Sequence, residues 1–422
     1  MSALLEAPEA FPAAAPKTAA LFARADAVIP GGIYGHVSPA AAVALASPYY
    51  AERAEGARYW DVDGREYLDF MCAYGPIVLG YAHPEVEAAV DAQRARGDAF
   101  NHPTERTVEL AERLVSLIDF ADWAVMAKNG GDMTTWAIRV AREHTKRPKI
   151  LKVQGAYHGV DPWCAQSPGG VIASDVAHIH SFAWNDAQGV LDLVRQHTGK
   201  VAGIIVTPYH HPVFSDQIEP EREFVTAIHD ICAREGIVLI VDDIRAGFRL
   251  SVHGSHGTYG WQPDLACYCK ALGNGYPVSA TVGEKALRVA ASKVFLTGSY
   301  WNGAAGLTAA LKTLEILERD AVPAALERAG KRLCDGLIAL GEKHGLPMKA
   351  TGPGCAPFVR IADESNFQKQ QAWTIAAMQP QADTPAAFFH PHHNWFVNAA
   401  HTDAEIDLAL TIADSALAET RR

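Results

Sequence analysis

Short runs of consecutive apolar residues recur through the middle of the chain, separated by stretches in which apolar residues return every three or four positions. An uninterrupted apolar run is typical of a strand that is buried on both faces, whereas the longer spacing is typical of an amphipathic helix. The strand candidates are WAVMA, KILKV, VAGIIV, GIVLIV, LACYC and SATVG. Their alternation with helix-like stretches or long connections predicts an α/β fold with a parallel or mixed central sheet.

The helix-like spacing dominates on either side of this strand-rich region. Before this region, apolar residues recur at intervals of three and four residues in PEVEAAVDAQRAR and TERTVELAERLVSLI. From Gly306 onward the same spacing continues in LTAALKTLEILERD, LERAGKRLCDGLIALGEKHG and AEIDLALTIADSALAET. The change in pattern predicts a large domain over residues 72–305, a small C-terminal domain over 306–422, and an N-terminal segment over 1–71 that forms an arm and part of the small domain.

Lys270 ends the apolar stretch LACYCK and is followed at once by the glycine-rich ALGNGYPVSA. Lysines usually extend to solvent, but a lysine held at the end of a buried strand can lose its proton and attack an aldehyde. Upstream, GIVLIVDD runs without a turn signal into Asp242 and Asp243, which places a carboxylate at the end of a second core strand. A lysine that can form a Schiff base and a buried carboxylate that can pair with a protonated pyridine nitrogen are what pyridoxal phosphate (PLP) chemistry requires.

Alternation along a strand separates the two adjacent aspartates. Successive strand residues point to opposite faces, so only one of Asp242 and Asp243 can reach a ring nitrogen, and the other is a structural carboxylate. The same alternation places Cys267 and Cys269 on the face opposite Lys270. Their C-x-C spacing favours core thiols over a redox or metal pair.

Several sequence blocks together carry a family resemblance. PGGIYGH, WDVDGREYLDF, YGPIVLGYAHPEV, GAYHG, VDDIRAGFR and YCKALGNGYPVSA resemble the class III PLP-dependent aminotransferases, on the branch of glutamate-1-semialdehyde aminomutase. The resemblance extends from about Pro30 to about Asp407, and the blocks fall in the family's order. It implies PLP-dependent transferase fold type I, a large domain with a mostly parallel sheet and a smaller α+β domain. It also implies that Lys270 holds PLP and that Asp242 meets the ring nitrogen.

The resemblance further implies where the phosphate of PLP binds. Gly130, Gly131 and Asp132 match the family's phosphate-binding segment and open a helical pattern, where backbone N–H groups favour an anion. The sequence departs from the family at Asp132, because an aspartate replaces the usual hydroxyl and would repel a phosphate at short range. Either Asp132 turns away to cap the helix, or Thr134 and Thr135 contribute hydroxyls in its place.

Other cofactor contacts are also implied by the resemblance. Tyr157 in GAYHG matches the aromatic residue that stacks on the pyridine ring, with His158 as its hydrogen-bonding neighbour. Ser299 in TGSYWNG matches a hydroxyl that reaches the phosphate from the neighbouring subunit, which implies a homodimer with shared active sites. Thr207 and Pro212 stand where the family has a glutamate and an asparagine near the cofactor hydroxyl, so that contact differs here. Without the resemblance, GAYHG and TGSYWNG are equally compatible with an ordinary turn and loop.

Departures from the aminomutase pattern bear on the substrate. Ser38 stands where the aminomutase carries an arginine for the substrate carboxylate, and FFHPHHNWFVNAAHT contains no arginine for a keto acid. A buried carboxylate needs a partner such as the fork-shaped arginine side chain. We therefore expect an amino donor without a carboxylate next to its reacting carbon. Arg245 and Arg249 are the candidates for binding the carboxylate of the acceptor.

MCAYGP, DDIRAGFR and HNWF most resemble a subgroup that acts on primary amines of extended aliphatic chains, such as the aminotransferase of hydrolysed fumonisin. The predicted reaction moves an amino group from a primary amine, such as a long-chain or polyhydroxylated aliphatic amine, to a keto acid such as pyruvate. Tyr34, His36, Tyr74 and Trp395 are candidate walls of the substrate pocket. The alternatives are an aminomutase, a racemase or a decarboxylase of the same fold, and a non-catalytic binding protein of the PLP fold.

Composition and charge argue against other classes of protein. At 422 residues, 49% hydrophobic and 20% charged, the chain has the composition of a soluble globular enzyme. A net charge of -11 with no lysine and arginine cluster argues against a nucleic-acid partner. No uninterrupted apolar run approaches the length of a membrane span, so we expect no membrane association.

Cysteines, the N-terminus and the histidines complete the expectations. Seven cysteines, an odd number, together with an N-terminus that lacks the positive charge of a signal peptide, favour reduced thiols and a cytoplasmic location.

The histidine-rich FFHPHHNW suggests a metal, but its spacing is not a known zinc pattern and no cysteine or carboxylate lies nearby. No metal site is predicted, and the segment is expected to line the substrate entrance or to form a polar loop.

Overall fold

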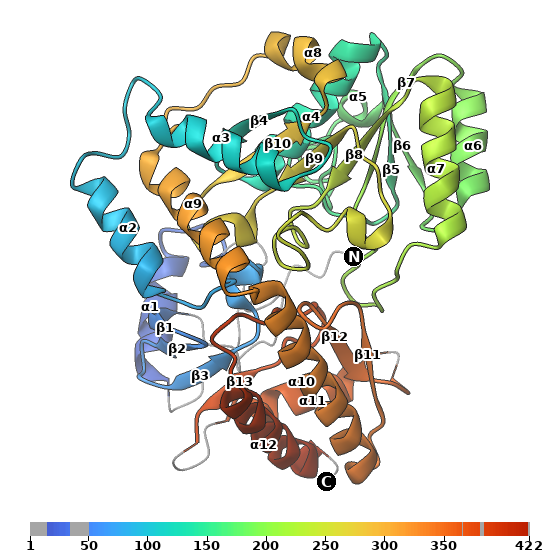
Figure 1. Cartoon of the computed structure of the whole chain (residues 1–422). Helices are drawn as coiled ribbons and strands as arrows, with labels where there is room; N and C mark the ends of the chain where they lie inside the picture. Colours follow the sequence, from blue (N-terminus) through green and yellow to red (C-terminus); the bar gives the residue numbers. More distant parts are fainter. Residues whose placement is uncertain (1–14, 34–49, 365, 380–383, 421–422) are drawn as a thin grey trace. The chain divides into compact units, whose positions relative to one another are not determined.

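The structure is a computed structural model that describes residues 15–33, 50–364, 366–379 and 384–420. These residues form two compact units (Figure 1). Unit 1 contains the described residues up to His83, the short segment Val213–Ser215, and the chain from Ala325 onward, whereas unit 2 contains Pro84–Pro212 and Asp216–Ala324. The sequence pattern favoured boundaries after residues 71 and 305. Both boundaries of the units fall later along the chain, after His83 and Ala324. The second is later because α9 (Ala304–Arg319) packs on two helices of unit 2, α2 (Pro84–Arg94) and α3 (Glu105–Leu117).

A seven-stranded sheet forms the centre of unit 2, with the strand order β4-β10-β9-β8-β7-β5-β6. β10 runs antiparallel to β4 and β9, and the other neighbouring strands are parallel. The sheet is therefore mixed and mostly parallel, which confirms the predicted fold class. Its strands are β4 (Trp123–Ala127), β5 (Lys149–Val153), β6 (Ile179–Phe182), β7 (Val201–Val206), β8 (Val238–Asp242), β9 (Leu265–Tyr268) and β10 (Ser279–Gly283).

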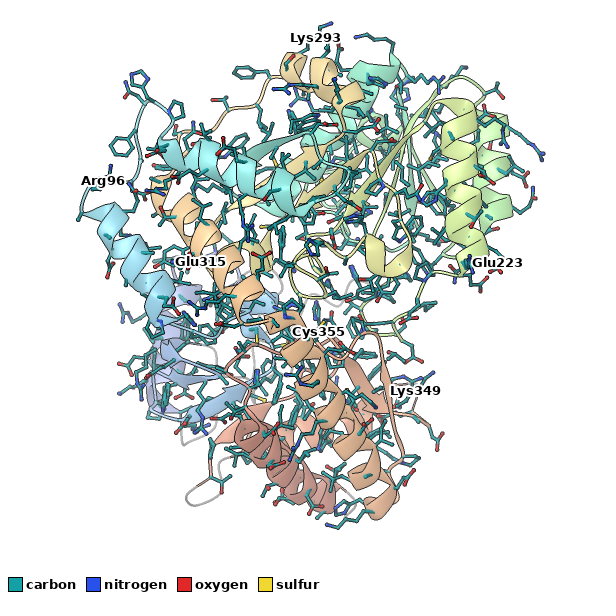
Figure 2. The ribbon with its side chains drawn as sticks, viewed as in Figure 1. Arg96, Glu223, Lys293, Glu315, Lys349 and Cys355 are labelled. Carbon is teal, nitrogen blue, oxygen red and sulfur yellow. The ribbon has the colours of Figure 1, made fainter. Side chains whose placement is uncertain are left out.

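Both faces of this sheet are covered, which explains the uninterrupted apolar runs. Every residue of β7 and β8 is buried. Side chains of one face, such as Ile240, pack with α4 (Gly130–Thr145) and α8 (Arg288–Lys293), while the alternate residues, such as Val241, pack with α6 (Ala187–Gln196) and α7 (Arg222–Glu235) (Figure 1). In Figure 2, Glu223 on α7 and Lys293 on α8 point outward, and both are exposed. The unit also contains the single-turn helix α5 (Ala173–Val176) and the 3₁₀ turns η4 (Gly257–Tyr259) and η6 (Lys285–Leu287).

Unit 1 has an α+β architecture. Its four-stranded sheet has the order β1-β2-β3-β13, and β13 runs parallel to β3. The core includes Trp373, Phe389 and Trp395. The elements are α1 (Pro16–Asp26), β1 (Ala51–Glu55), β2 (Arg58–Asp61), β3 (Glu66–Asp69), β11 (Met348–Thr351), β12 (Phe358–Ile361), α11 (Gln368–Ala377), β13 (Ala386–Phe388) and α12 (Asp403–Thr420), with α10 (Val322–His344) beginning at the end of unit 2. Within the described residues, no helix is both long and apolar enough to cross a membrane.

A left-handed turn follows β3 and carries Tyr74, one of the predicted substrate residues. Cys72, Ala73 and Tyr74 have φ angles of 48°, 53° and 64°, a conformation that is costly for residues with a Cβ atom. The buried carboxylate of Asp69 holds this turn, because it accepts hydrogen bonds from the N–H groups of Met71 (2.7 Å) and Cys72 (3.0 Å). The hydroxyl of Tyr81 donates a third, at 2.7 Å.

Replacing Asp69 with alanine should lower the free energy of unfolding by about 3 kcal/mol, because three buried donors lose their acceptor in a strained turn. Asp63→Ala is the matched control, since Asp63 also accepts three hydrogen bonds, from Lys17 and Thr18 at the start of α1, but near the surface. Its cost should be about 1 kcal/mol. Chemical denaturation measures both values, and equal losses in the two variants would contradict the assigned role of Asp69.

Candidate active site

A cavity of about 380 Å³ lies in unit 2 at the carboxyl ends of β8 and β9. Ligands of open α/β sheets bind at this edge of the sheet. The cavity brings together every predicted cofactor contact except Ser299, and Arg245 lies there as well. The lining residues are Asn129, Gly130, Gly131, Asp132, Tyr157, His158, Gly159, Val160, Asp161, His211, Asp242, Ile244, Arg245, Cys269 and Lys270.

Lys270 opens the 3₁₀ turn η5 (Lys270–Gly273) directly after β9. Its φ angle of 44° lies in the left-handed region, a strained conformation that is common at functional sites. Burial, and then the positive charge of Arg245, lower the pKa of Lys270 to about 7. A substantial fraction of the side chain is therefore a neutral amine near pH 7, which is the nucleophilic form.

The two adjacent aspartates point in different directions, as strand alternation predicted. Asp242 lines the cavity, and its Oδ2 lies 2.7 Å from Nδ1 of His158. Asp243 is fully buried elsewhere and accepts hydrogen bonds from the backbone N–H (2.7 Å) and the hydroxyl of Ser255. Burial raises the pKa of Asp243 to about 7. Asp242 is thus the carboxylate presented to a ligand, while Asp243 fixes the loop that contains Ser255.

The start of α4 faces the cavity, and Asp132 caps it. Oδ2 of Asp132 accepts a hydrogen bond from the backbone N–H of Asn129 at 2.9 Å, so the carboxylate turns back onto the residue before the helix. The hydroxyl of Thr134 donates to the carbonyl of His158 at 2.6 Å, and that of Thr135 donates to Asp161. Of the two alternatives for this segment, the structure has the capping aspartate. The first N–H groups of a helix have no partner within it, which leaves this end suited to an anion.

Two glycines allow the GAYHG segment to lie against the start of α4. Gly159 has a φ angle of 129°, and a Cβ atom on it would lie 2.9 Å from the Cα of Gly131. The adjacent Tyr157 is 46% exposed and lines the cavity. The ring of His158 is buried and stacks on Trp163 with centroids 6.0 Å apart. Nε2 of His158 is buried with no hydrogen-bond partner among the described residues.

His211 and Cys269 line the cavity, although neither was predicted from the sequence to lie there. His211 follows β7, and burial and the charge of Arg245 hold its pKa well below the usual value. In the sequence, His211 follows the predicted strand VAGIIV, and this position is the feature that points to the cavity. Cys269 was expected on the face opposite Lys270, but that prediction is wrong, because β9 ends at Tyr268 and strand alternation ends with it.

The remaining candidates lie outside this cavity. Ser299 is exposed on the connection between α8 and α9. Tyr74 is half-buried in unit 1, with its ring 5.4 Å from that of His393. Trp395 is fully buried in the core of unit 1, and its indole N–H donates to the carbonyl of His390 at 2.9 Å. The candidate substrate wall therefore does not include Trp395. Tyr34, His36 and Ser38 lie outside the described residues.

The histidine-rich segment is organised by hydrogen bonds. Nδ1 of His390 accepts hydrogen bonds from the backbone N–H groups of His392 and His393, both at 3.1 Å. Burial lowers the pKa of His392 to about 4, so its ring is neutral. Across residues 15–33, 50–364, 366–379 and 384–420, no group of three or more histidine, cysteine, aspartate or glutamate side chains could hold a metal ion.

The lining of the cavity fits PLP on chemical grounds. A neutral amine suits the aldehyde, a buried carboxylate suits a protonated ring nitrogen, and a helix start suits the phosphate. Tyr157 and Ile244 provide flat or apolar surface for the ring. Asp242, Lys270 and the start of α4 lie at or just beyond the ends of strands, where ligands bind in other α/β enzymes.

Residues 40–376 match the family model described as aminotransferase class-III. The chain belongs to this family. It is 42% identical over 399 residues to an aminopentol aminotransferase of Sphingopyxis macrogoltabida, covering 94% of this chain and 93% of that protein. It is 32% identical to a glutamate-1-semialdehyde 2,1-aminomutase of Dechloromonas aromatica (strain RCB), covering 95% and 98%. The protein is therefore a PLP-dependent aminotransferase.

A solved structure supports the same conclusion about the fold. The FumI protein of Sphingopyxis sp. MTA144, in a form that carries PLP, superposes on this chain with a TM-score of 0.93 at 41% identity. The match covers 96% of each chain. Both the fold type and the cofactor expected from the sequence are thereby confirmed.

The pKa of Lys270 predicts how PLP attachment depends on pH. In the cofactor-free protein, the rate at which added PLP attaches should rise with a midpoint near pH 7 and level off above it, because only the neutral amine attacks. The growth of yellow absorbance after mixing measures this rate. Arg245→Met removes a neighbouring positive charge and should move the midpoint upward. A midpoint near the ordinary lysine value of about 10.4 would contradict the assignment.

Proposed function

We propose that this aminotransferase takes its amino group from a primary amine of an extended aliphatic chain, with Lys270 and Asp242 as the catalytic residues. The observation that carries the proposal is the make-up of the cavity. Among the described residues that line it, Arg245 is the only arginine, so there is one guanidinium for a carboxylate. The donor and the acceptor occupy the site in turn, so this guanidinium suffices for a keto acid acceptor, and a donor without a carboxylate requires none. The identity to an aminopentol aminotransferase supports a donor of this kind.

Each side chain has a proposed task in the reaction. PLP, when bound, delocalises the electron pair that remains on the substrate carbon after its proton is removed. Nζ of Lys270 would take that proton from the substrate carbon and give it to the former aldehyde carbon of the cofactor, and a pKa of about 7 allows it both to accept and to donate the proton. The negative charge of Asp242 keeps the ring nitrogen protonated, and His158 holds Asp242 in place at 2.7 Å. The start of α4 binds the phosphate, and Tyr157 covers the ring.

A panel of amines tests this function. With pyruvate as acceptor, a long-chain 2-amine should give ketone and alanine in equal amounts, and glutamate-1-semialdehyde should be a poor substrate. Lys270→Ala should lower the rate by at least about a thousandfold. Lys152→Met is the matched control, because Lys152 is a half-buried lysine of unit 2 outside the cavity, and it should stay active. Preference for the semialdehyde, or its isomerisation without an acceptor, would instead identify an aminomutase.

We also propose that Arg245 binds the carboxylate of the acceptor. Arg245 is only 9% exposed and lines the same cavity as Lys270. A guanidinium can bind a carboxylate with two parallel hydrogen bonds, and an ammonium cannot.

Arg245→Lys should therefore raise KM for pyruvate about tenfold or more while changing KM for the amine little. An aldehyde acceptor, which has no carboxylate, serves as the control substrate and should be used as well by the variant as by the wild type. Steady-state kinetics with both acceptors measures the difference. Equal losses with pyruvate and the aldehyde would contradict this role.

We propose that the working enzyme is a homodimer in which Ser299 contacts the phosphate bound to its partner subunit. Ser299 lies outside the cavity of its own unit, on an exposed connection. The same connection exposes Phe295 (75%) and Tyr300 (72%), which is unusual for aromatic side chains unless another surface covers them.

Hybrid dimers test this arrangement. Lys270→Ala and Ser299→Asp subunits should each be inactive alone, the second because its carboxylate repels the phosphate. After subunit exchange, about a quarter of wild-type activity should return, since half of the dimers are hybrid and each hybrid has one intact site. Activity assays and molar-mass measurements on the mixture provide the readout. No recovery despite proven exchange would count against a shared site.

A further inference from the structure

His211 is a buried titratable side chain of the cavity that has no task in the reaction proposed above. It follows β7, the strand next to β8, and is only 8% exposed. It lines the same cavity as Asp242 and Lys270. Its position therefore allows direct contact with whatever occupies the cavity.

The other polar groups of the cavity are already engaged near α4 or at Asp242. Asn129 and Asp132 are hydrogen-bonded to each other, and Asp161 accepts from Thr135 on α4. His158 contacts Asp242. With Arg245 assigned to the acceptor and Tyr157 to the face of the ring, His211 still has no proposed task, and the hydrogen bond of its ring is to its own backbone.

The chemistry of PLP indicates which part of the cofactor His211 faces. In PLP, the aldehyde carbon lies between the phosphate arm and the ring hydroxyl, and the ring nitrogen lies opposite the aldehyde. Once Lys270, Asp242 and the start of α4 hold the aldehyde, the nitrogen and the phosphate, the hydroxyl must face away from α4. In the strand order, β4, which leads into α4, and β7, which leads to His211, lie on opposite sides of the β8 and β9 pair.

Neighbouring residues of the same loop cannot make this contact. The hydroxyl of Thr207 donates to the carbonyl of Tyr209 at 2.8 Å, and Pro212 has no N–H group. The ring of His210 stacks on Trp184, with centroids 5.6 Å apart, and does not line the cavity. Among the described residues of this loop, His211 alone presents a polar side chain to the cavity.

The surroundings of His211 keep its ring neutral. Burial comes first, followed by the positive charge of Arg245, and together they hold the pKa of His211 well below the usual value. A hydrogen bond to its own backbone opposes this shift, while His210 and then Lys270 add to it, and the ring of Tyr209 lies 5.4 Å away. The carboxylate of Asp242 lines the same cavity as His211. A neutral imidazole has one N–H donor and one acceptor nitrogen.

We propose that His211 binds PLP by donating a hydrogen bond from its neutral ring to the cofactor's ring oxygen, an inference that rests on the placement of PLP proposed above. The donor stabilises the negatively charged form of that oxygen. The bound cofactor therefore loses its proton, and changes colour, at a lower pH than it would without His211.

A pair of variants of similar size separates hydrogen bonding from shape. His211→Leu removes every hydrogen bond, whereas His211→Asn keeps an N–H donor. In the holoenzyme, His211→Leu should raise the pH midpoint of the colour change by about one unit and weaken PLP binding about tenfold. His211→Asn should show less than half of either effect. His210→Phe is the control on the neighbouring residue and should match the wild type.

Absorbance titration and equilibrium binding of PLP give these values without an activity assay. If His211→Leu does not fold, His211→Phe replaces it, and thermal unfolding identifies the folded variants. A midpoint and affinity in the apolar variant equal to those of the wild type would overturn the inference while leaving the proposed function intact. A wild-type protein that binds PLP without the yellow colour would overturn the placement of PLP itself.

Discussion

The hydrogen bond between Asp242 and His158, 2.7 Å long and almost fully buried, is the interaction on which the candidate active site depends. It joins the end of β8 to the GAYHG segment that follows β5. The same segment is tied to α4, because the hydroxyl of Thr134 donates to the carbonyl of His158. One polar network therefore fixes Asp242, the GAYHG segment and the start of α4 relative to one another. Buried hydrogen bonds of this kind hold the groups that they join in one arrangement.

Close backbone packing adds a second constraint. Gly131 and Gly159 lie so near each other that a side chain on Gly159 would have to displace α4. The carboxylate of Asp132 turns back to the backbone N–H of Asn129 and so caps α4. An aspartate at this position is thus compatible with an anion at the start of the helix, because its carboxylate serves the helix.

Much of this could be predicted from the sequence, for reasons that are local. Six apolar runs predicted six strands of the central sheet, because a strand that is buried on both faces consists of consecutive apolar residues. β6 was missed because several of its residues are partly exposed and do not form such a run. Lys270 and Asp242 stood out because they interrupt that pattern at strand ends. His211 was not identified, and Cys269 and Trp395 were placed wrongly, because the environments of all three depend on tertiary packing. His211 reaches the cavity from a loop, Cys269 follows the end of strand alternation, and Trp395 is enclosed by Phe389 and Trp373.

The central claim is that Lys270 carries the cofactor at the end of β9, and one measurement tests it directly. Borohydride reduction of the PLP-loaded protein fixes the cofactor on the lysine that holds it, and mass spectrometry of the digested protein locates the label. Stoichiometric label on the peptide that contains Lys270 is the predicted result. Label on another half-buried lysine of unit 2, such as Lys128 or Lys152, with Lys270 unmodified, would contradict the account.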